Sequence, residues 1–198
     1  PTGPTPRQRG SPEGSAAPHG AKAAALPAGD PSTGVPLGPI IDARQRDKID
    51  AIVRETVGAG ARVTAGGGYD RLFYEATVLA DVTPEHAAFQ KEIFGPVAPV
   101  TRFGSVDELV ELVNASDYGL SPGILAKDAF RAYELADRLP SGILHINDQT
   151  VDDESQAPFG GVGASGTGAR FGGHEANIEA FTETQWVTMQ ADVATYPF

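Results

Sequence analysis

The side chains able to do chemistry in this 198-residue chain do not include a thiol, because the sequence contains no cysteine. A chain without cysteine has no disulfide, no thiolate metal ligand and no sulfur nucleophile. Two short runs stand out among the remaining residues, Glu-Ile-Phe-Gly-Pro-Val at 92–97 and Pro-Phe-Gly-Gly at 158–161. Taken alone, Glu92 is typical of a solvated loop carboxylate and Phe159 of a core residue.

The segment Gly161–Gly166 fits the GxGxxG pattern of a dinucleotide site. That pattern needs a strand directly before it and a helix directly after it, so that the helix N-terminus meets the pyrophosphate. Here Pro158 precedes the segment, and more glycines follow it at 168, 172 and 173. We therefore predict a structural loop in which backbones approach closely, with nucleotide binding as the alternative. The same reasoning excludes Ser165 as a nucleophile elbow.

The candidates for a metal site are three adjacent acids at 152–154 and four histidines. Adjacent acids on a loop point in different directions into water, and no histidine lies near them to complete a site. The histidines lack ligand spacing, and His145 alternates within an apparent strand, which favours a structural role. We therefore expect no metal.

The charge balance limits the partners of the chain. The formal net charge is -11 and the pI is near 4.7, so the protein repels phosphate backbones, and we expect no nucleic-acid partner. No apolar run approaches the roughly 18 residues of a membrane-spanning helix, and the start lacks the order of a secretory signal. We expect a cytoplasmic protein with no membrane partner.

Residues 1–20 differ from the rest of the chain. They contain five prolines and four glycines, with two alanines as the only apolar side chains, so they cannot bury enough surface to offset their ordering entropy. We expect a disordered or non-homologous segment. The chain begins with Pro1, and we expect it to be a fragment of a longer protein.

Hydrophobic periodicity predicts three helices that position the candidate residues. The first covers 41–56, and the second begins at a capping box formed by Ser105 and Glu108 and ends near Asn114. The third begins at Asp128 and runs to Leu139. The predicted buried residues are Ile49, Ile52, Val53 and Val57 in the first helix, and Val106, Leu109, Val110 and Val113 in the second.

Strands alternate with these helices. β-branched and aromatic runs predict strands at 61–65, 73–79, 97–103, 120–126 and 143–146. A glycine-rich loop at 160–173, a short helix at 174–179 and a terminal strand at 181–189 follow. The alternation predicts an α/β fold with a mainly parallel sheet, flanking helices and functional loops at the carboxyl ends of the strands.

The longer motifs carry a family resemblance. The two runs at 92–97 and 158–161 occur in order with Ser141–Asn147, Gln156–Gly161 and Ser165-Gly166, and upstream with Leu37–Ile41, Phe73–Val78 and Asn114–Leu120. Over about residues 20–190 the chain resembles the C-terminal part of an aldehyde dehydrogenase. The resemblance implies a partial catalytic domain at 21–180 and a terminal oligomerisation strand and tail at 181–198.

The resemblance also implies roles for four residues. The residue matching Glu92 accepts hydrogen bonds from the hydroxyls of the nicotinamide ribose, and a carboxylate offers two acceptor oxygens to a diol. The residue matching Phe94 packs near the nicotinamide, where an aromatic face limits the position of the ring. Phe159 would line the substrate pocket. Asn147 would shape the end of a strand beside that pocket, or its amide would be satisfied by backbone.

The implied function is oxidation of an aldehyde to the carboxylic acid with NAD or NADP as hydride acceptor. The sequence from His145 to Gly173 resembles that of enzymes for aromatic aldehydes of the benzaldehyde and vanillin type. The family mechanism begins with thiolate attack, and this chain has neither that nucleophile nor an assignable general base, so we expect no activity from the chain alone. The alternative is a non-catalytic interaction module that pairs with intact subunits through its C-terminal strand. Homo-oligomerisation would use the same strand.

Overall fold

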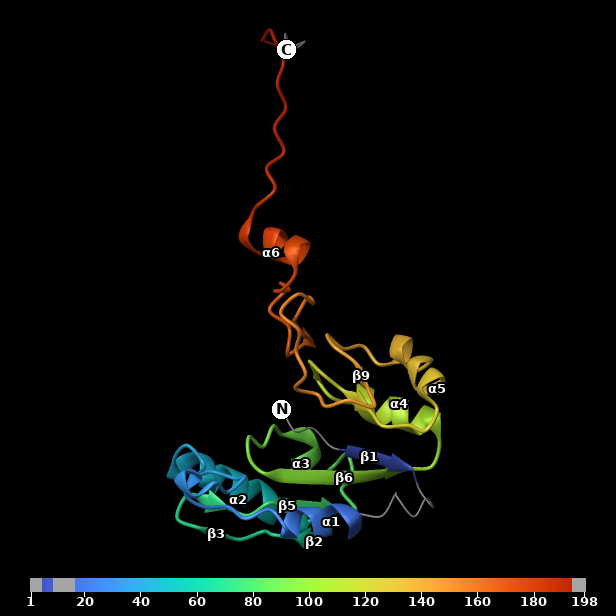
Figure 1. Ribbon diagram of the computed structural model, residues 1–198. Helices are drawn as coiled ribbons and strands as arrows, with labels where there is room; N and C mark the ends of the chain where they lie inside the picture. The colour runs from blue at the N-terminus through green and yellow to red at the C-terminus, as the bar shows by residue number, and fades with distance from the viewer. Residues whose placement is uncertain (1–4, 9–16, 194–198) are drawn as a thin grey trace. The chain divides into compact units, whose positions relative to one another are not determined.

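The computed structural model describes residues 5–8 and 17–193 (Figure 1). The chain divides into two compact units, unit 1 at Pro1–Ser116 and unit 2 at Asp117–Phe198. The segment 1–20, which we predicted to be without order, is described in part. A strand forms at Thr5–Gln8 and a helix begins at Ala17, and the rest of that prediction lies outside the described residues.

Unit 1 is built on a four-stranded sheet with the order β1-β6-β5-β2 (Figure 1). β1 and β5 both pair with β6 in parallel, and β2 pairs with β5 in antiparallel fashion. β3 and β4 form a separate antiparallel pair. The strands are β1 Thr5–Gln8, β2 Arg62–Ala65, β3 Tyr69–Asp70, β4 Phe73–Tyr74, β5 Thr77–Ala80 and β6 Val97–Phe103.

Four α-helices accompany the sheet of unit 1. α1 lies against β2 and β5, α2 packs on α3, and α4 lies against β1 and β6. A 3-10 turn at Pro31–Thr33 precedes α2. The helices are α1 Ala17–Ala24, α2 Ala43–Gly58, α3 Ala87–Gln90 and α4 Val106–Asn114.

The first predicted helix is confirmed as α2, with one change in its buried face. Its first turn is capped by Asp42, whose carboxylate accepts a hydrogen bond from the Gln45 N–H at 2.7 Å. The predicted residues Ile49, Ile52 and Val53 are buried, whereas Val57 is exposed. Thr56 is fully buried in its place, and its hydroxyl accepts the Ala88 N–H at 3.0 Å. The polar side chain is accepted in the core because it has this backbone partner.

The central strand and the second helix also agree with prediction in position. β6 has the predicted bounds 97–103, and Ser105 caps α4 by accepting the Glu108 N–H at 3.1 Å. The Glu108 carboxylate accepts the Gly104 N–H at 2.6 Å. The predicted buried face of α4 is half-buried, since Leu109, Val110 and Val113 are partly covered, and the prediction is wrong for Val106, which is exposed.

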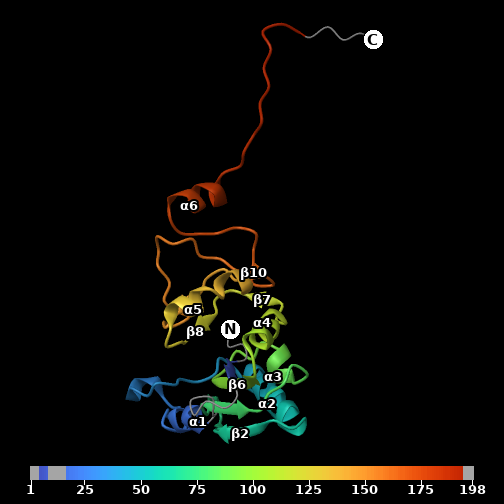
Figure 2. The same cartoon turned by 90° about the vertical axis from the view of Figure 1, so that its right-hand side faces the viewer.

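Unit 2 consists of short elements joined by long loops (Figure 2). β8 pairs with β9 in parallel, and β7 pairs with β10 in antiparallel fashion. The predicted strands at 120–126 and 143–146 shrink to two residues each, and the helix predicted from Asp128 to Leu139 ends as an α-helix at Tyr133. The elements are β7 Tyr118–Gly119, β8 Gly123–Ile124, α5 Ala129–Tyr133, a 3-10 turn at Ala136–Arg138, β9 His145–Ile146, β10 Val162–Gly163 and α6 His174–Phe181.

Two features of the predicted fold class are corrected. The sheets are mixed and not mainly parallel, since parallel and antiparallel pairs are equal in number among the described strands. The terminal strand at 181–189 does not form. Phe181 ends α6, and residues 182–190 have no regular secondary structure; Figures 1 and 2 draw them in red as extended chain. A strand needs a hydrogen-bonded neighbour, and this segment has none among the described residues of unit 2.

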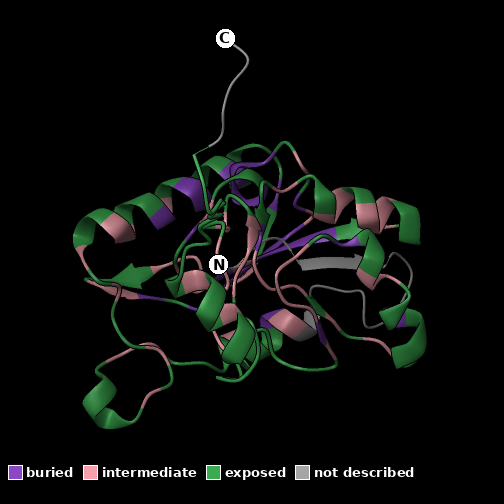
Figure 3. Cartoon of the chain, turned by 90° about the horizontal axis from the view of Figure 1, so that it is seen from above, coloured by how far each residue is buried: buried purple, intermediate pink, exposed green. Residues whose placement is uncertain are grey.

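The core of unit 1 is one cluster of apolar side chains from α2, α3, the sheet and the loop that follows α3. Figure 3 colours the buried residues purple. Tyr74, Ile49, Leu79 and Ile93 are among its largest fully buried members. Within the described part of the chain, no helix is both long and apolar enough to cross a bilayer.

Candidate functional site

The loop at 91–96 carries two of the predicted site residues, Glu92 and Phe94, between α3 and β6. Ile93 lies between them and is fully buried in the core of unit 1, whereas Phe94 is 61% exposed. Phe94 has a φ of 51°, in the left-handed region that non-glycine residues seldom adopt. The buried Ile93 therefore anchors a turn that presents Phe94 to solvent and leaves Glu92 half-buried.

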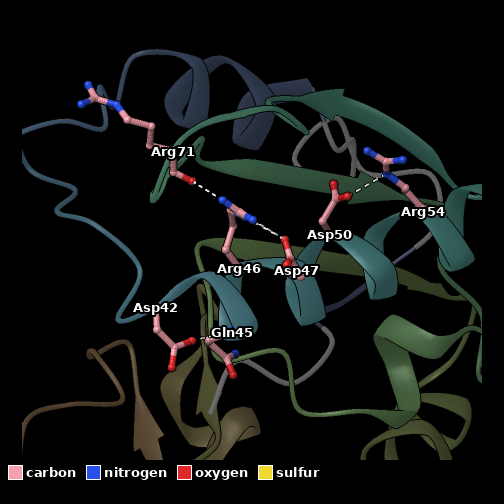
Figure 4. A network of polar contacts seen from close by, with 7 residues as sticks. All are labelled: Asp42, Gln45, Arg46, Asp47, Asp50, Arg54 and Arg71. Atoms are coloured by element: carbon pink, nitrogen blue, oxygen red, sulfur yellow. Dashed lines mark hydrogen bonds and ion pairs between the residues drawn. The ribbon is translucent and has the colours of Figure 1, made fainter.

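Gln45 of α2 holds this turn in place. Its amide Nε2 donates to the carbonyl oxygens of Ile93 at 2.9 Å and of Phe94 at 3.2 Å. The cap residue Asp42 fixes the backbone of Gln45 in turn, and Figure 4 shows that pair at the start of α2. Sequence reasoning missed Gln45. Its spacing of four residues before the buried Ile49 is the signal that places it on the inner side of the helix.

Gly95 is required by the packing of the same turn. A Cβ built on Gly95 would lie 2.5 Å from Cδ1 of Ile49 and 2.9 Å from its Cγ1, closer than carbon atoms approach without strain. Gly95 therefore serves the backbone shape of the turn. Beside the turn lies a hollow of about 340 Å³ lined by Pro39, Ile40, Ile41, Gln45 and Phe94.

The outer face of α2 carries a polar network that steadies the neighbouring loop (Figure 4). Arg46 pairs with Asp47 at 2.6 Å, donates to the carbonyl of Arg71 at 2.9 Å and lies over the ring of Tyr69. Tyr74 is buried. Burial away from water, helped by the charge of Asp50, raises the pKa of Tyr74 to about 12. These contacts position the β3–β4 pair and offer no group for chemistry.

In unit 2, Phe159 belongs to a loop that is paired by its backbone. Its N–H donates to the Phe171 carbonyl at 2.6 Å, and the Phe171 N–H donates back at 2.9 Å. The Phe159 side chain is 38% exposed. A Cβ on Gly142 would overlap the carbonyl of Gly160, so two backbone segments meet directly beside Phe159.

Asn147 acts on the backbone at the end of β9. It has a φ of 60°, its N–H donates to the Ile124 carbonyl at 2.8 Å, and its Oδ1 accepts the Ala126 N–H at 2.8 Å. Of the two readings left open for its amide, the structure supports satisfaction by backbone. Asn147 therefore ties the end of β9 to the segment that follows β8.

The glycine-rich segment at 161–166 lacks the geometry of a dinucleotide fingerprint. It contains the two-residue strand β10 and a turn, and the next helix begins only at His174. A Cβ on Gly161 would lie 2.6 Å from the Ser165 carbonyl oxygen, and the Ser165 hydroxyl accepts the Gly119 N–H at 3.3 Å. The loop is closed on itself, as predicted for a structural role.

The remaining titratable groups have no shared site. The acids at 152–154 are exposed, and among the described residues no three histidine, aspartate or glutamate side chains gather as metal ligands. His145 is buried in β9, and its Nε2 has no hydrogen-bond partner among the described residues. A satisfied structural histidine was the expectation from the sequence, and the bare Nε2 differs from it.

Comparisons with known proteins agree on one family. A family model described as "Aldehyde dehydrogenase family" matches residues 17–187. The chain is 62% identical to a vanillin dehydrogenase of Amycolatopsis sp. over 89% of its own length and 37% of the relative's. It is 48% identical to a benzaldehyde dehydrogenase [NAD(+)] of Pseudomonas putida, over 87% and 36%. The chain thus spans a little more than a third of the curated relatives it matches.

A solved structure gives the same result for the fold. The crystal structure of an aldehyde dehydrogenase from Brucella melitensis biovar abortus 2308 matches with a TM-score of 0.83 at 30% identity. That match covers 92% of this chain and 38% of the crystal chain.

Proposed function

Because this chain belongs to the aldehyde dehydrogenase family, we propose that it is part of an enzyme that oxidises an aromatic aldehyde to the acid with NAD or NADP. The observation that carries this proposal is the identity of 62% and 48% to relatives named for vanillin and benzaldehyde. The bound nicotinamide would accept the hydride. This chain would supply one wall of the aldehyde pocket and part of the cofactor-binding site.

The turn at 91–96 fits the cofactor role. The carbonyls of Ile93 and Phe94 are engaged by Gln45, whereas the Glu92 carboxylate has no partner among the described residues and is available to a ribose diol. The exposed ring of Phe94 lies beside an apolar hollow. A flat nicotinamide ring would find an aromatic face there whose position is set by the buried Ile93.

Phe159 fits the substrate role, because its partly exposed ring sits on a loop whose backbone is fixed by Phe171. Asn147 would contribute by shape, since its amide oxygen is already bonded. The chain has no cysteine, so a thiolate for covalent catalysis has to come from polypeptide other than these 198 residues. We therefore expect no aldehyde oxidation from this chain alone.

A hybrid enzyme tests the proposal. Residues 17–187 would replace the matching segment of the Amycolatopsis vanillin dehydrogenase, and NADH formation would be followed with vanillin, benzaldehyde and a short aliphatic aldehyde. We expect activity that prefers the aromatic substrates. A folded hybrid that is inactive, or that prefers the aliphatic aldehyde, would contradict the proposal. Oxidation by the 198-residue chain alone would contradict its dependence on an outside nucleophile.

Glu92→Gln in the hybrid separates the cofactor role from the rest. Losing a charged acceptor should raise the KM for NAD about tenfold, with the KM for the aldehyde unchanged. Glu111→Gln is the matched control, because Glu111 is an exposed carboxylate on α4. Equal effects of the two substitutions would remove Glu92 from the cofactor site.

The second candidate function is an interaction module that pairs with intact subunits through residues 182–193. This segment exposes Trp186 to 90% and Met189 to 92%, and it has no strand neighbour in unit 2. An extended chain with unpaired backbone groups can add to a sheet edge of another copy. Size-exclusion chromatography with the intact Amycolatopsis relative tests this, with a chain shortened after Phe181 as control. Absence of co-elution, or co-elution that survives the shortening, would contradict it.

A further inference from the structure

Arg170 lies in the loop between β10 and α6 and makes two bonds to the backbone of unit 2. Its Nη1 donates to the carbonyl oxygens of Gly142 and Gly160, at 2.9 Å each. The side chain is half-buried. Hydrogen bonds from a charged donor are stronger than neutral ones, so this contact is a strong one in a unit with few buried side chains.

The position of the two carbonyls explains why a cation is needed. Gly142 and Gly160 approach so closely that a Cβ on Gly142 would overlap the Gly160 carbonyl. Two carbonyl oxygens that meet at one nitrogen bring partial negative charges together, and a guanidinium, which stays charged, offsets their repulsion. Arg170 therefore joins two segments that would otherwise separate.

The joined segments carry the residue that our proposed function places in the aldehyde pocket. Gly160 directly follows Phe159, and Arg170 directly precedes Phe171. Phe159 and Phe171 bond to each other in both directions. The peptide of Phe159 and Gly160 is thus held by Phe171 through its backbone and by Arg170 through its side chain, which leaves the Phe159 ring little freedom to shift as a whole.

We propose that Arg170 is a positioning residue of the aldehyde pocket, which fixes the backbone that carries Phe159 and so holds this part of the pocket wall in place for aromatic substrates. This proposal rests on the proposed function. An aromatic aldehyde is large enough to pack on a Phe159 side chain whose backbone is held in place, whereas a short aliphatic aldehyde makes little contact with it. Arg170 would act through Phe159 and would not itself touch the substrate.

The kinetic test uses the hybrid enzyme with Arg170→Met, Arg170→Lys and the control Arg131→Met. Arg131 is exposed on α5 and loses the same charge. We expect Arg170→Met to raise the KM for benzaldehyde about tenfold, with kcat and the KM for NAD within about twofold and the aliphatic aldehyde unaffected. Arg170→Lys should restore part of the loss. Equal changes in all three parameters, or an equal effect of Arg131→Met, would overturn the proposal.

A second measurement uses the 198-residue chain and does not depend on activity. Amide hydrogen exchange of Phe159 and Phe171 should be about tenfold faster in Arg170→Met than in the unmodified chain, with residues 43–58 unchanged. Unchanged exchange at Phe159 would overturn the contact itself. If the unmodified hybrid is inactive, the proposed function fails and the substrate role of Arg170 fails with it, whereas faster exchange would still establish the backbone contact.

Discussion

The two units of this chain are held together in different ways. Sixteen of the eighteen buried apolar residues among those described belong to unit 1, and only Ala132 and Leu139 belong to unit 2. In unit 2 large apolar side chains are exposed, including Phe130 at 86% and Leu125 at 78%. Its order comes instead from backbone pairing, close glycine contacts and one arginine.

This difference separates two sources of precision at a site. In unit 1 the packed core fixes Ile93, and the packing of Ile93 sets the position of the neighbouring Phe94. In unit 2 the position of Phe159 depends on hydrogen bonds between backbone segments. Exposed apolar side chains that gather in a patch are typical of interaction sites. Destabilising substitutions should therefore act through side-chain packing in unit 1 and through backbone contacts in unit 2.

The largest effect is expected in the core of unit 1. Ile49→Ala removes a fully buried side chain that packs on Gly95 and should destabilise unit 1 by about 4 kcal/mol. The matched change Leu125→Ala in unit 2 removes an exposed side chain and should cost less than about 0.5 kcal/mol. Urea unfolding followed by circular dichroism measures both. Equal shifts would break the comparison.

A glycine substitution tests the backbone contacts of unit 2. Gly142→Ala forces a methyl group against the Gly160 carbonyl and should cost about 3 kcal/mol, the upper range for overpacking. Gly168→Ala meets open space, and only its φ of 83° opposes it, at about 1 kcal/mol. Hydrogen exchange across 141–173 is the measurement. A larger effect at Gly168 would contradict the contact.

A buried hydroxyl gives a smaller effect in unit 1. Thr56→Val keeps the volume of the side chain but leaves the buried Ala88 N–H without its acceptor, at about 2 kcal/mol. The expected result is a lower urea midpoint together with faster exchange at Ala88. Thr182→Val at the end of α6 is the exposed control. No change at Thr56 would show that the hydroxyl is dispensable.

The smallest effect concerns pH. The pKa of Tyr74 is raised from 10.0 to about 12, chiefly by burial. The folded state therefore favours the neutral phenol, and the stability this contributes is present below pH 10 and lost as the pH rises to 12. Tyr74→Phe should change stability at pH 7 by less than about 0.5 kcal/mol, since the hydroxyl has no described partner. Tyr74→Phe should also reduce the loss of folding stability between about pH 10 and 12. The exposed Tyr133→Phe should leave that loss unchanged.

The sequence predicted those features of unit 1 that depend on local patterns. The bounds of β6, the cap at Ser105 and most of the α2 face were found, because periodicity and capping are properties of neighbouring residues. For the same reason the cap at Asp128 was found in unit 2. The exchange of Val57 for Thr56 was missed, since it depends on a single hydrogen bond to Ala88. The length of the strands in unit 2 was overestimated, because pairing partners decide where a strand ends.

The site was predicted by resemblance, and its supports were not predicted at all. The roles of Glu92, Phe94, Phe159 and Asn147 rest on motifs and stay predictions. Gln45 and Arg170 both act by donating to backbone carbonyls. The spacing of Gln45 from Ile49 indicates the inner side of α2, but the sequence does not indicate which carbonyl accepts either bond, because any backbone carbonyl is an acceptor and only the fold decides which one is near.

The place of β1 in the sheet has a practical consequence. β1 covers one side of β6 along Val100–Phe103, yet Thr5–Gln8 lie outside the residues that match the family. Trimming the chain to its matched portion would uncover a row of amide and carbonyl groups along β6, and such rows recruit other chains into aggregates. Thr5–Gln8 thus occupy an edge of β6 that would otherwise lie open, although they stand outside the residues matched to the family.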